Sequence, residues 1–160
     1  MLLIWGVLAL VGGFAGARDI FNPLPVFLTE SRTAQPVPGS LFQRIKTLQE
    51  LEAHLAEAKA SGKPAMLDYY ADWCTDCLRM EKATLADPEV RAELTRRFAL
   101  IQADVTDSDH PETKAMKTRF GVYGPPAMLF FSSTGTEQQE LRTYGFLDKP
   151  AFLAILRRIN

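Results

Sequence analysis

The sequence predicts an α/β domain, with a mixed sheet that carries helices on both faces, preceded by an apolar transmembrane-like segment. Short apolar runs alternate with stretches of helical periodicity, in the order helix, strand, helix, strand, helix, strand, strand, helix. The 160 residues are 47% hydrophobic and 23% charged, which suits one globular core and is too little for two large domains. We therefore expect a single folded domain with a modest N-terminal extension.

The charge balance argues against a polyanion partner. Eighteen basic and 19 acidic residues are mixed along the chain and give a formal net charge of -1. Such a chain has no long-range field that attracts nucleic acid. We expect no nucleic-acid partner.

The N-terminal extension divides into two parts before the domain at residues 42–160. Residues 1–17 contain no charge and reach the short end of the range for a bilayer span, so we interpret them as the end of a transmembrane helix. A signal-like segment and a buried core helix are the alternatives. Residues 18–41 contain four prolines without a sustained apolar period, which is typical of an extended linker.

The first half of the domain shows clear start and stop signals. Thr47 and Glu50 form a possible capping box for a helix that Gly62 closes. Residues 65–71 are short, apolar and aromatic, which predicts a buried strand, and a helix follows Cys74.

The second half of the domain continues the alternation. Asp87, followed by a proline, predicts the N-cap of another helix, and Asp148 predicts the N-cap of the last one. Between them the pattern predicts further strands and one helix. The expected strands are residues 98–105, 127–132 and 141–145, and the expected helix is residues 109–119.

The strongest chemical signal is the pair Cys74 and Cys77, placed where a strand gives way to a helix. Two intervening residues let both sulfurs meet across one turn, and the first sulfur then lies beside the free N–H groups at the helix start. That position favours a thiolate, which attacks disulfides. We assign attack to Cys74 and resolution of the mixed disulfide to Cys77.

Two alternatives compete with a redox role for the cysteines. A disulfide that closes so short a loop stabilises a fold by only about 2 kcal/mol, which is a weak reason for a purely structural bond. A zinc site usually needs four ligands, and His54 and His110 lie in unrelated segments. We therefore expect no metal and no cofactor beyond the redox-active disulfide Cys74–Cys77.

Several stretches carry a family resemblance. These stretches are LDYYADWCTDCLRMEKATLADPEV, GPPAMLFFSSTG, GFLDKPAFLAIL and the apolar N-terminus with RDIFNPLP. They resemble the C-terminal thioredoxin-like domain of the bacterial thiol:disulfide interchange protein DsbD family. The resemblance implies a thioredoxin fold at the bacterial inner membrane, with the soluble domain in the periplasm. It also implies an electron relay, in which a membrane electron-donor domain reduces this domain and this domain reduces periplasmic thiol-disulfide proteins, including those of cytochrome c maturation.

By position, the resemblance places the acidic residues Asp68 and Glu81 near the cysteines. A carboxylate close to Cys74 disfavours the thiolate, and a destabilised thiolate makes the pair a better electron donor. The alternative for Glu81 is an ordinary solvated helix residue. Asp68 lies inside an apolar strand, which an incidental charge seldom does.

Three further residues complete the candidate site. Asp76, between the cysteines, either tunes the redox pair or complements the helix dipole. Pro126 matches by resemblance the position of a cis-proline that faces the CxxC motif, with a simple turn as the alternative. We expect Trp73 to cover the rim of the site or to pack at the strand end. Tyr69, Tyr70 and Phe130 are expected in the core.

Two questions of function stay open. A stand-alone membrane-anchored thioredoxin-like reductase of the cytochrome c maturation type is an alternative, and a metal carrier or thiol-dependent binding module is another. The apolar segment is followed by the basic residues Arg18, Arg32, Arg44 and Lys46, and no basic residue precedes it. Taken alone, this distribution of charge indicates a cytoplasmic domain. The resemblance indicates the periplasm, and we follow it.

Overall fold

A computed structural model describes residues 40–159 of the chain. The expected membrane helix at residues 1–17 and nearly all of the expected linker lie outside the described residues. Within residues 40–159, none of the helices combines the length and apolar character needed to span a bilayer.

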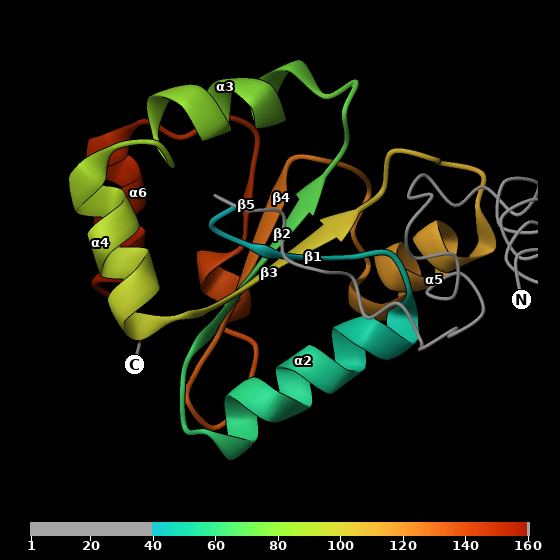
Figure 1. The fold of residues 1–160 in the computed structure, drawn as a ribbon, viewed down its shortest axis with the longest axis horizontal. Coiled ribbons are helices and arrows are strands. Elements are labelled where there is room, and N and C mark those ends of the chain that lie inside the picture. Colours follow the sequence, from blue (N-terminus) through green and yellow to red (C-terminus); the bar gives the residue numbers. More distant parts are fainter. Residues whose placement is uncertain (1–39, 160) are drawn as a thin grey trace, which may run out of the picture. The chain divides into compact units, whose positions relative to one another are not determined.

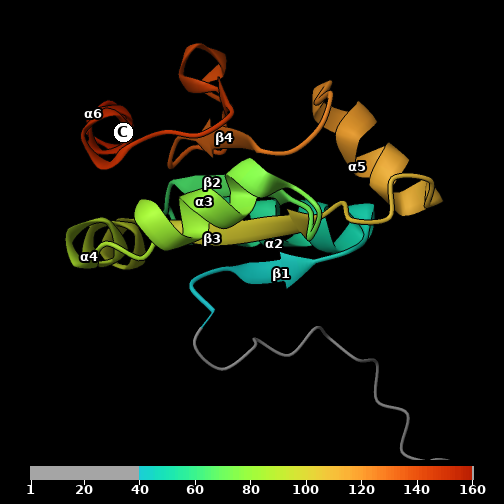
Figure 2. The ribbon, with the colours of Figure 1, turned by 90° about the horizontal axis from the view of Figure 1, so that it is seen from above.

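The centre of the described domain is a five-stranded mixed sheet in the order β1-β3-β2-β4-β5 (Figures 1 and 2). The three strands β1, β3 and β2 run parallel, whereas β4 is antiparallel to β2 and β5 is antiparallel to β4. This arrangement confirms the predicted mixed sheet. The strands are β1 Gln43–Ile45, β2 Ala65–Tyr70, β3 Ala99–Asp104, β4 Ala127–Phe131 and β5 Thr143–Tyr144.

Helices cover both faces of the sheet, as predicted. Alternate residues of β2 and β4 point to opposite faces, so each strand contributes to two apolar clusters. One cluster lies under α2 and α5, and the other lies under α3, α4 and α6. Figure 1 shows α2 and α3 on opposite sides of the sheet. The helices are α2 Leu48–Ala60, α3 Thr75–Ala83, α4 Pro88–Arg97, α5 Pro111–Phe120 and α6 Lys149–Leu156.

The helix starts follow the predicted caps. The Thr47 hydroxyl accepts from the Glu50 amide at 3.2 Å, and the Glu50 carboxylate accepts from the Thr47 amide at 3.1 Å, which completes the capping box. Asp87 and Asp148 cap α4 and α6 through their side chains. These local hydrogen bonds fix where the chain leaves each loop.

Two elements differ from the sequence prediction. β1 was not predicted, because it has only three residues and its short, mostly polar sequence lacks an apolar run. The strand expected at residues 141–145 was too long: a short 3-10 helix occupies Gln139–Leu141, and β5 comprises only Thr143–Tyr144. Leu141 belongs to this 3-10 helix and is buried. The sequence pattern alone did not distinguish this buried apolar residue from one in a strand.

Replacing Phe130 with alanine tests the cluster beneath α3, α4 and α6. Phe130 is fully buried, and its loss leaves a cavity that should lower the free energy of unfolding by about 3–5 kcal/mol. Urea unfolding of the oxidised protein measures this change. Tyr123→Ala is the matched control, because Tyr123 is 91% exposed and the loss of its ring should change stability by roughly 0.5 kcal/mol or less. Equal effects of the two changes would contradict this packing.

Candidate active site

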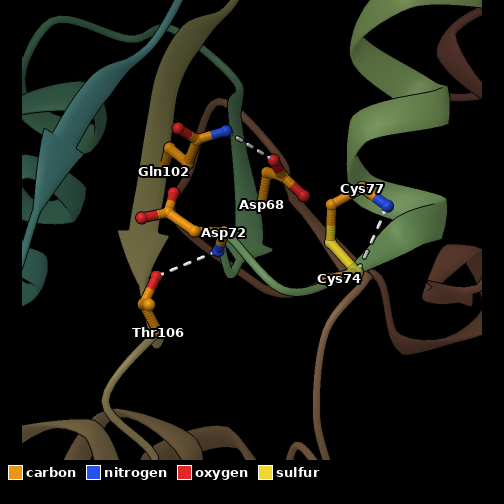
Figure 3. Close-up of a disulfide and its surroundings, with 6 residues drawn as sticks. All are labelled: Asp68, Asp72, Cys74, Cys77, Gln102 and Thr106. Atoms are coloured by element: carbon orange, nitrogen blue, oxygen red, sulfur yellow. Dashed lines mark hydrogen bonds between the residues drawn. A yellow bond between two sulfur atoms is a disulfide. The ribbon is translucent and has the colours of Figure 1, made fainter.

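Cys74 and Cys77 form a disulfide at the start of α3, with their Cα atoms 5.3 Å apart. Cys74 is the N-cap of the helix, and its Sγ accepts a hydrogen bond from the Cys77 amide at 3.2 Å (Figure 3). The first sulfur therefore lies at the positive end of the helix dipole, as the spacing predicted. Both cysteines are buried to a similar extent, so the helix position rather than exposure supports Cys74 as the attacking residue.

Thr106 fixes the loop that leads to the disulfide. Its hydroxyl accepts from the Asp72 amide at 3.0 Å, and its carbonyl accepts from the Trp73 indole N–H at 2.8 Å. The same hydroxyl donates to Asp104 at 2.6 Å. Sequence reasoning missed Thr106, although one signal was available: the carboxyl ends of neighbouring parallel strands meet at one sheet edge, and Thr106 lies just beyond β3.

Pro126 lies at the same end of the sheet as the disulfide loop. The peptide bond between Pro125 and Pro126 is cis, the geometry that the resemblance implied. The antiparallel register pairs Tyr69 with Ala127, which places Pro126 one residue beyond, beside the end of β2. Trp73 is 58% exposed on this edge, consistent with a residue at the rim. Tyr69 and Tyr70 are buried, as predicted.

Asp68 is a carboxyl group buried in the middle of β2, with only 4% of its surface exposed. The Gln102 amide donates to its Oδ2 at 2.9 Å, and Figure 3 shows Asp68 between Gln102 and the cysteine pair. Burial disfavours the charged form and raises the pKa of Asp68 to about 6. The Gln102 hydrogen bond and the charge of Arg44 oppose this rise, whereas the negative charge of Glu81 adds to it.

The two other acidic residues of the predicted site lie on α3 in different surroundings. Glu81 follows Cys77 by four residues, so helical geometry puts both on one face, and its charge reaches Asp68. Asp76 is exposed in the first turn of α3, a position that suits an acid at a helix N-terminus. The charge of Glu81 thus acts on Asp68, whereas Asp76 lies at the surface.

The described residues offer no set of side chains arranged to bind a metal ion. Among residues 40–159, no three histidine, cysteine or acidic side chains are grouped so that they could hold a metal ion.

A disulfide at a helix start, on a mixed sheet with a cis-proline at the same edge, defines a class: thiol:disulfide oxidoreductases of thioredoxin fold. Residues 51–160 match the family described as a thioredoxin-like domain. The chain belongs to this family and, within it, groups with the C-terminal domain of DsbD.

Relatives and solved structures support this grouping. The thiol:disulfide interchange protein DsbD of Ralstonia nicotianae is 43% identical over 159 residues, 99% of this chain, and DsbD 1 of Pseudomonas aeruginosa is 37% identical over 158 residues. The chain spans only 26% of the length of each of these two relatives. The oxidised C-terminal domain of Neisseria meningitidis DsbD is 31% identical with a TM-score of 0.62, and the match covers 73% of this chain and 99% of that one.

Replacing Asp68 with asparagine should change how stability depends on pH. The folded pKa near 6 exceeds the value of about 3.9 for an unfolded aspartate, so the folded protein binds this proton more tightly. The free energy of unfolding of the native protein should therefore fall as pH rises through this window. Asp68→Asn should remove this fall and stabilise the oxidised protein at pH 7 by on the order of 1–3 kcal/mol.

Urea unfolding of the oxidised protein between pH 4 and 8 would measure this effect. Asp109→Asn is the control, because the Asp109 side chain is fully exposed and its replacement should leave the profile of the native protein intact. A parallel pH profile for Asp68→Asn and the native protein would show that Asp68 does not titrate as described.

Proposed function

We propose that this domain relays electron pairs from a membrane electron-donor domain to periplasmic thiol-disulfide proteins through Cys74 and Cys77. The observation that carries the proposal is the disulfide at the start of α3, with the Cys74 sulfur as the helix cap. A sulfur in this place is stabilised as a thiolate by the helix N-terminus, and it is adjacent to the second sulfur that must displace a bound partner.

Electron delivery proceeds in two exchange steps. In the reduced domain, the Cys74 thiolate attacks one sulfur of a partner disulfide, so a mixed disulfide forms and the partner's other sulfur leaves as a thiolate that takes a proton. Cys77 then loses its proton and attacks the Cys74 sulfur, which forms the Cys74–Cys77 disulfide and releases the partner's second thiolate. Two electrons pass to the partner, and a donor dithiol restores the domain by the reverse exchange.

The carboxyl groups support the direction of transfer. A negative charge near the sulfurs disfavours the thiolate of the reduced form, which makes the dithiol a better donor. Asp68, with a pKa near 6, exists in both protonation states close to neutral pH, and Figure 3 shows it on the side of Gln102 that faces the cysteine pair, so it is our candidate to accept the proton that Cys77 releases.

The partners and the location are inferred from the family. The relatives that cover this chain almost completely carry the name thiol:disulfide interchange protein, and they are about four times longer than the chain. This supports a donor domain elsewhere in a longer protein, membrane attachment through residues 1–17 and a periplasmic position for the domain. A stand-alone anchored reductase would use the same dithiol and differ in its donor.

Trapping in cells tests the exchange and the location together. Cys77→Ala should accumulate mixed disulfides through Cys74, because the resolving thiol is missing, whereas Cys74→Ala should accumulate none. Acid quenching, non-reducing electrophoresis and identification of the captured proteins measure this. Periplasmic partners are expected. Capture through Cys77 alone would overturn the assignment, and capture of cytoplasmic proteins would overturn the location.

Neutralising Glu81 should make the cysteine pair less reducing. Glu81→Gln removes a negative charge that raises the pKa of Asp68, so both that pKa and the electron-donating tendency should fall, with the potential rising by on the order of 10–30 mV. Equilibration with a glutathione redox buffer measures the potential. Asp76→Asn provides a comparison, because it neutralises an acid at an exposed position of the same helix. An unchanged potential for Glu81→Gln would contradict redox tuning by Glu81.

The comparison of Asp76→Asn with Glu81→Gln also distinguishes the two interpretations of Asp76, redox tuning and stabilisation of the helix dipole. If Asp76 serves the helix dipole, its replacement should lower stability by roughly 0.3–1 kcal/mol and leave the potential near that of the native protein. A shift in the potential as large as that of Glu81→Gln would instead indicate redox tuning by Asp76.

A further inference from the structure

A row of polar side chains crosses the parallel part of the sheet beneath the active site. The register pairs Arg44 of β1 with Gln102 of β3, and Gln102 with Asp68 of β2, so the three residues lie side by side on one face. The Arg44 Nε donates to the Gln102 Oε1 at 3.0 Å, and the Gln102 Nε2 donates to the Asp68 Oδ2 at 2.9 Å. A continuous hydrogen-bonded path therefore joins Arg44 to Asp68.

The chemistry of arginine fixes the direction of this path. A guanidinium group only donates hydrogen bonds, so the side of the Gln102 amide that faces Arg44 must be the oxygen. The NH₂ group then faces Asp68 and must donate to it. Gln102 is 1% exposed, so water cannot readily satisfy the amide in the flipped orientation.

We propose that Arg44 is a positioning residue for the active site, which acts through Gln102 to favour the ionised form of the Asp68 carboxylate. A donor locked against a carboxyl oxygen stabilises the charged form more than the protonated form. Burial and the negative charge of Glu81 favour the protonated form of Asp68, whereas Arg44 and Gln102 favour its ionised form. The balance keeps Asp68 able to accept a proton near neutral pH.

Charged and polar groups act on Asp68 from two sides. Glu81 of α3 acts on Asp68 from the helix side, and Gln102 and Arg44 act from the neighbouring strands. The Arg44 guanidinium also lies 4.6 Å from the centre of the Tyr70 ring, which holds it over β2. The effect of the row on sulfur chemistry rests on the proposed function, whereas its effect on the titration of Asp68 does not.

The direct test is a carboxyl-carbon NMR titration of Asp68 in the oxidised protein. Arg44→Met keeps much of the side-chain length but removes the charge and the donor, and it should raise the midpoint by about half a pH unit or more. Arg44→Lys retains a positive charge and a donor and should return the midpoint toward that of the native protein. Arg119→Met is the matched control, because Arg119 also lies 4.6 Å from the centre of an aromatic ring, that of Phe120 on α5.

A second comparison tests whether Arg44 acts through Gln102 rather than directly through space. Gln102→Leu removes the amide, so adding Arg44→Met to it should shift the midpoint by less than half as much as in the native background. An Arg44→Met midpoint equal to that of Arg119→Met would overturn the proposal, and so would fully additive shifts in the double variant.

A kinetic readout separates this proposal from the proposed function. The rate of partner reduction by Arg44→Met should show a pH profile displaced in the same direction as the Asp68 midpoint. A displaced midpoint with an undisplaced rate profile would support the positioning of Asp68 by Arg44 and would contradict the role of Asp68 in the exchange reaction.

Discussion

The parallel pairing of β2 with β3 is the constraint on which the site depends. It brings the carboxyl ends of both strands to one edge, so the loop after β2 and the loop after β3 lie side by side and hydrogen-bond through Thr106. The same pairing sets Asp68 against Gln102. The register between β2 and β3 thus positions both the disulfide loop and the Asp68 carboxyl group. A shift of this register by one residue would separate the loop from Thr106 and Asp68 from Gln102.

The site contains a conflict between stability and function. An ionised carboxyl group within an apolar strand opposes folding at neutral pH, and packing alone would favour an apolar residue there. Asp68 is nevertheless surrounded by groups that act on its charge in opposite directions. Such opposing influences on a buried acid next to a reactive disulfide are typical of a functional site, where local stability is lower than the fold could achieve.

The sequence predicted those features whose signals are local. The spacing of Cys74 and Cys77, the caps and the apolar runs each lie within a few residues, and the structure contains them. The family resemblance placed Asp68 near the cysteines, and the charge within an apolar run supported that placement. Gln102 and Thr106 could not be found in this way, because their roles arise from residues at least 33 positions away along the chain that strand pairing brings close. Arg44 was interpreted only as a charge after the apolar segment, because the short strand that contains it was not predicted.

Trp73 shows what this architecture means for an incoming protein. More than half of the Trp73 surface faces solvent, yet its indole N–H is already bonded to the Thr106 carbonyl. The ring therefore has little rotational freedom to lose when another molecule covers it, and it brings no unsatisfied donor into the interface. In the proposed exchange reaction, a flat, preorganised apolar surface next to Cys74 in the chain would lower the entropic cost of each brief contact.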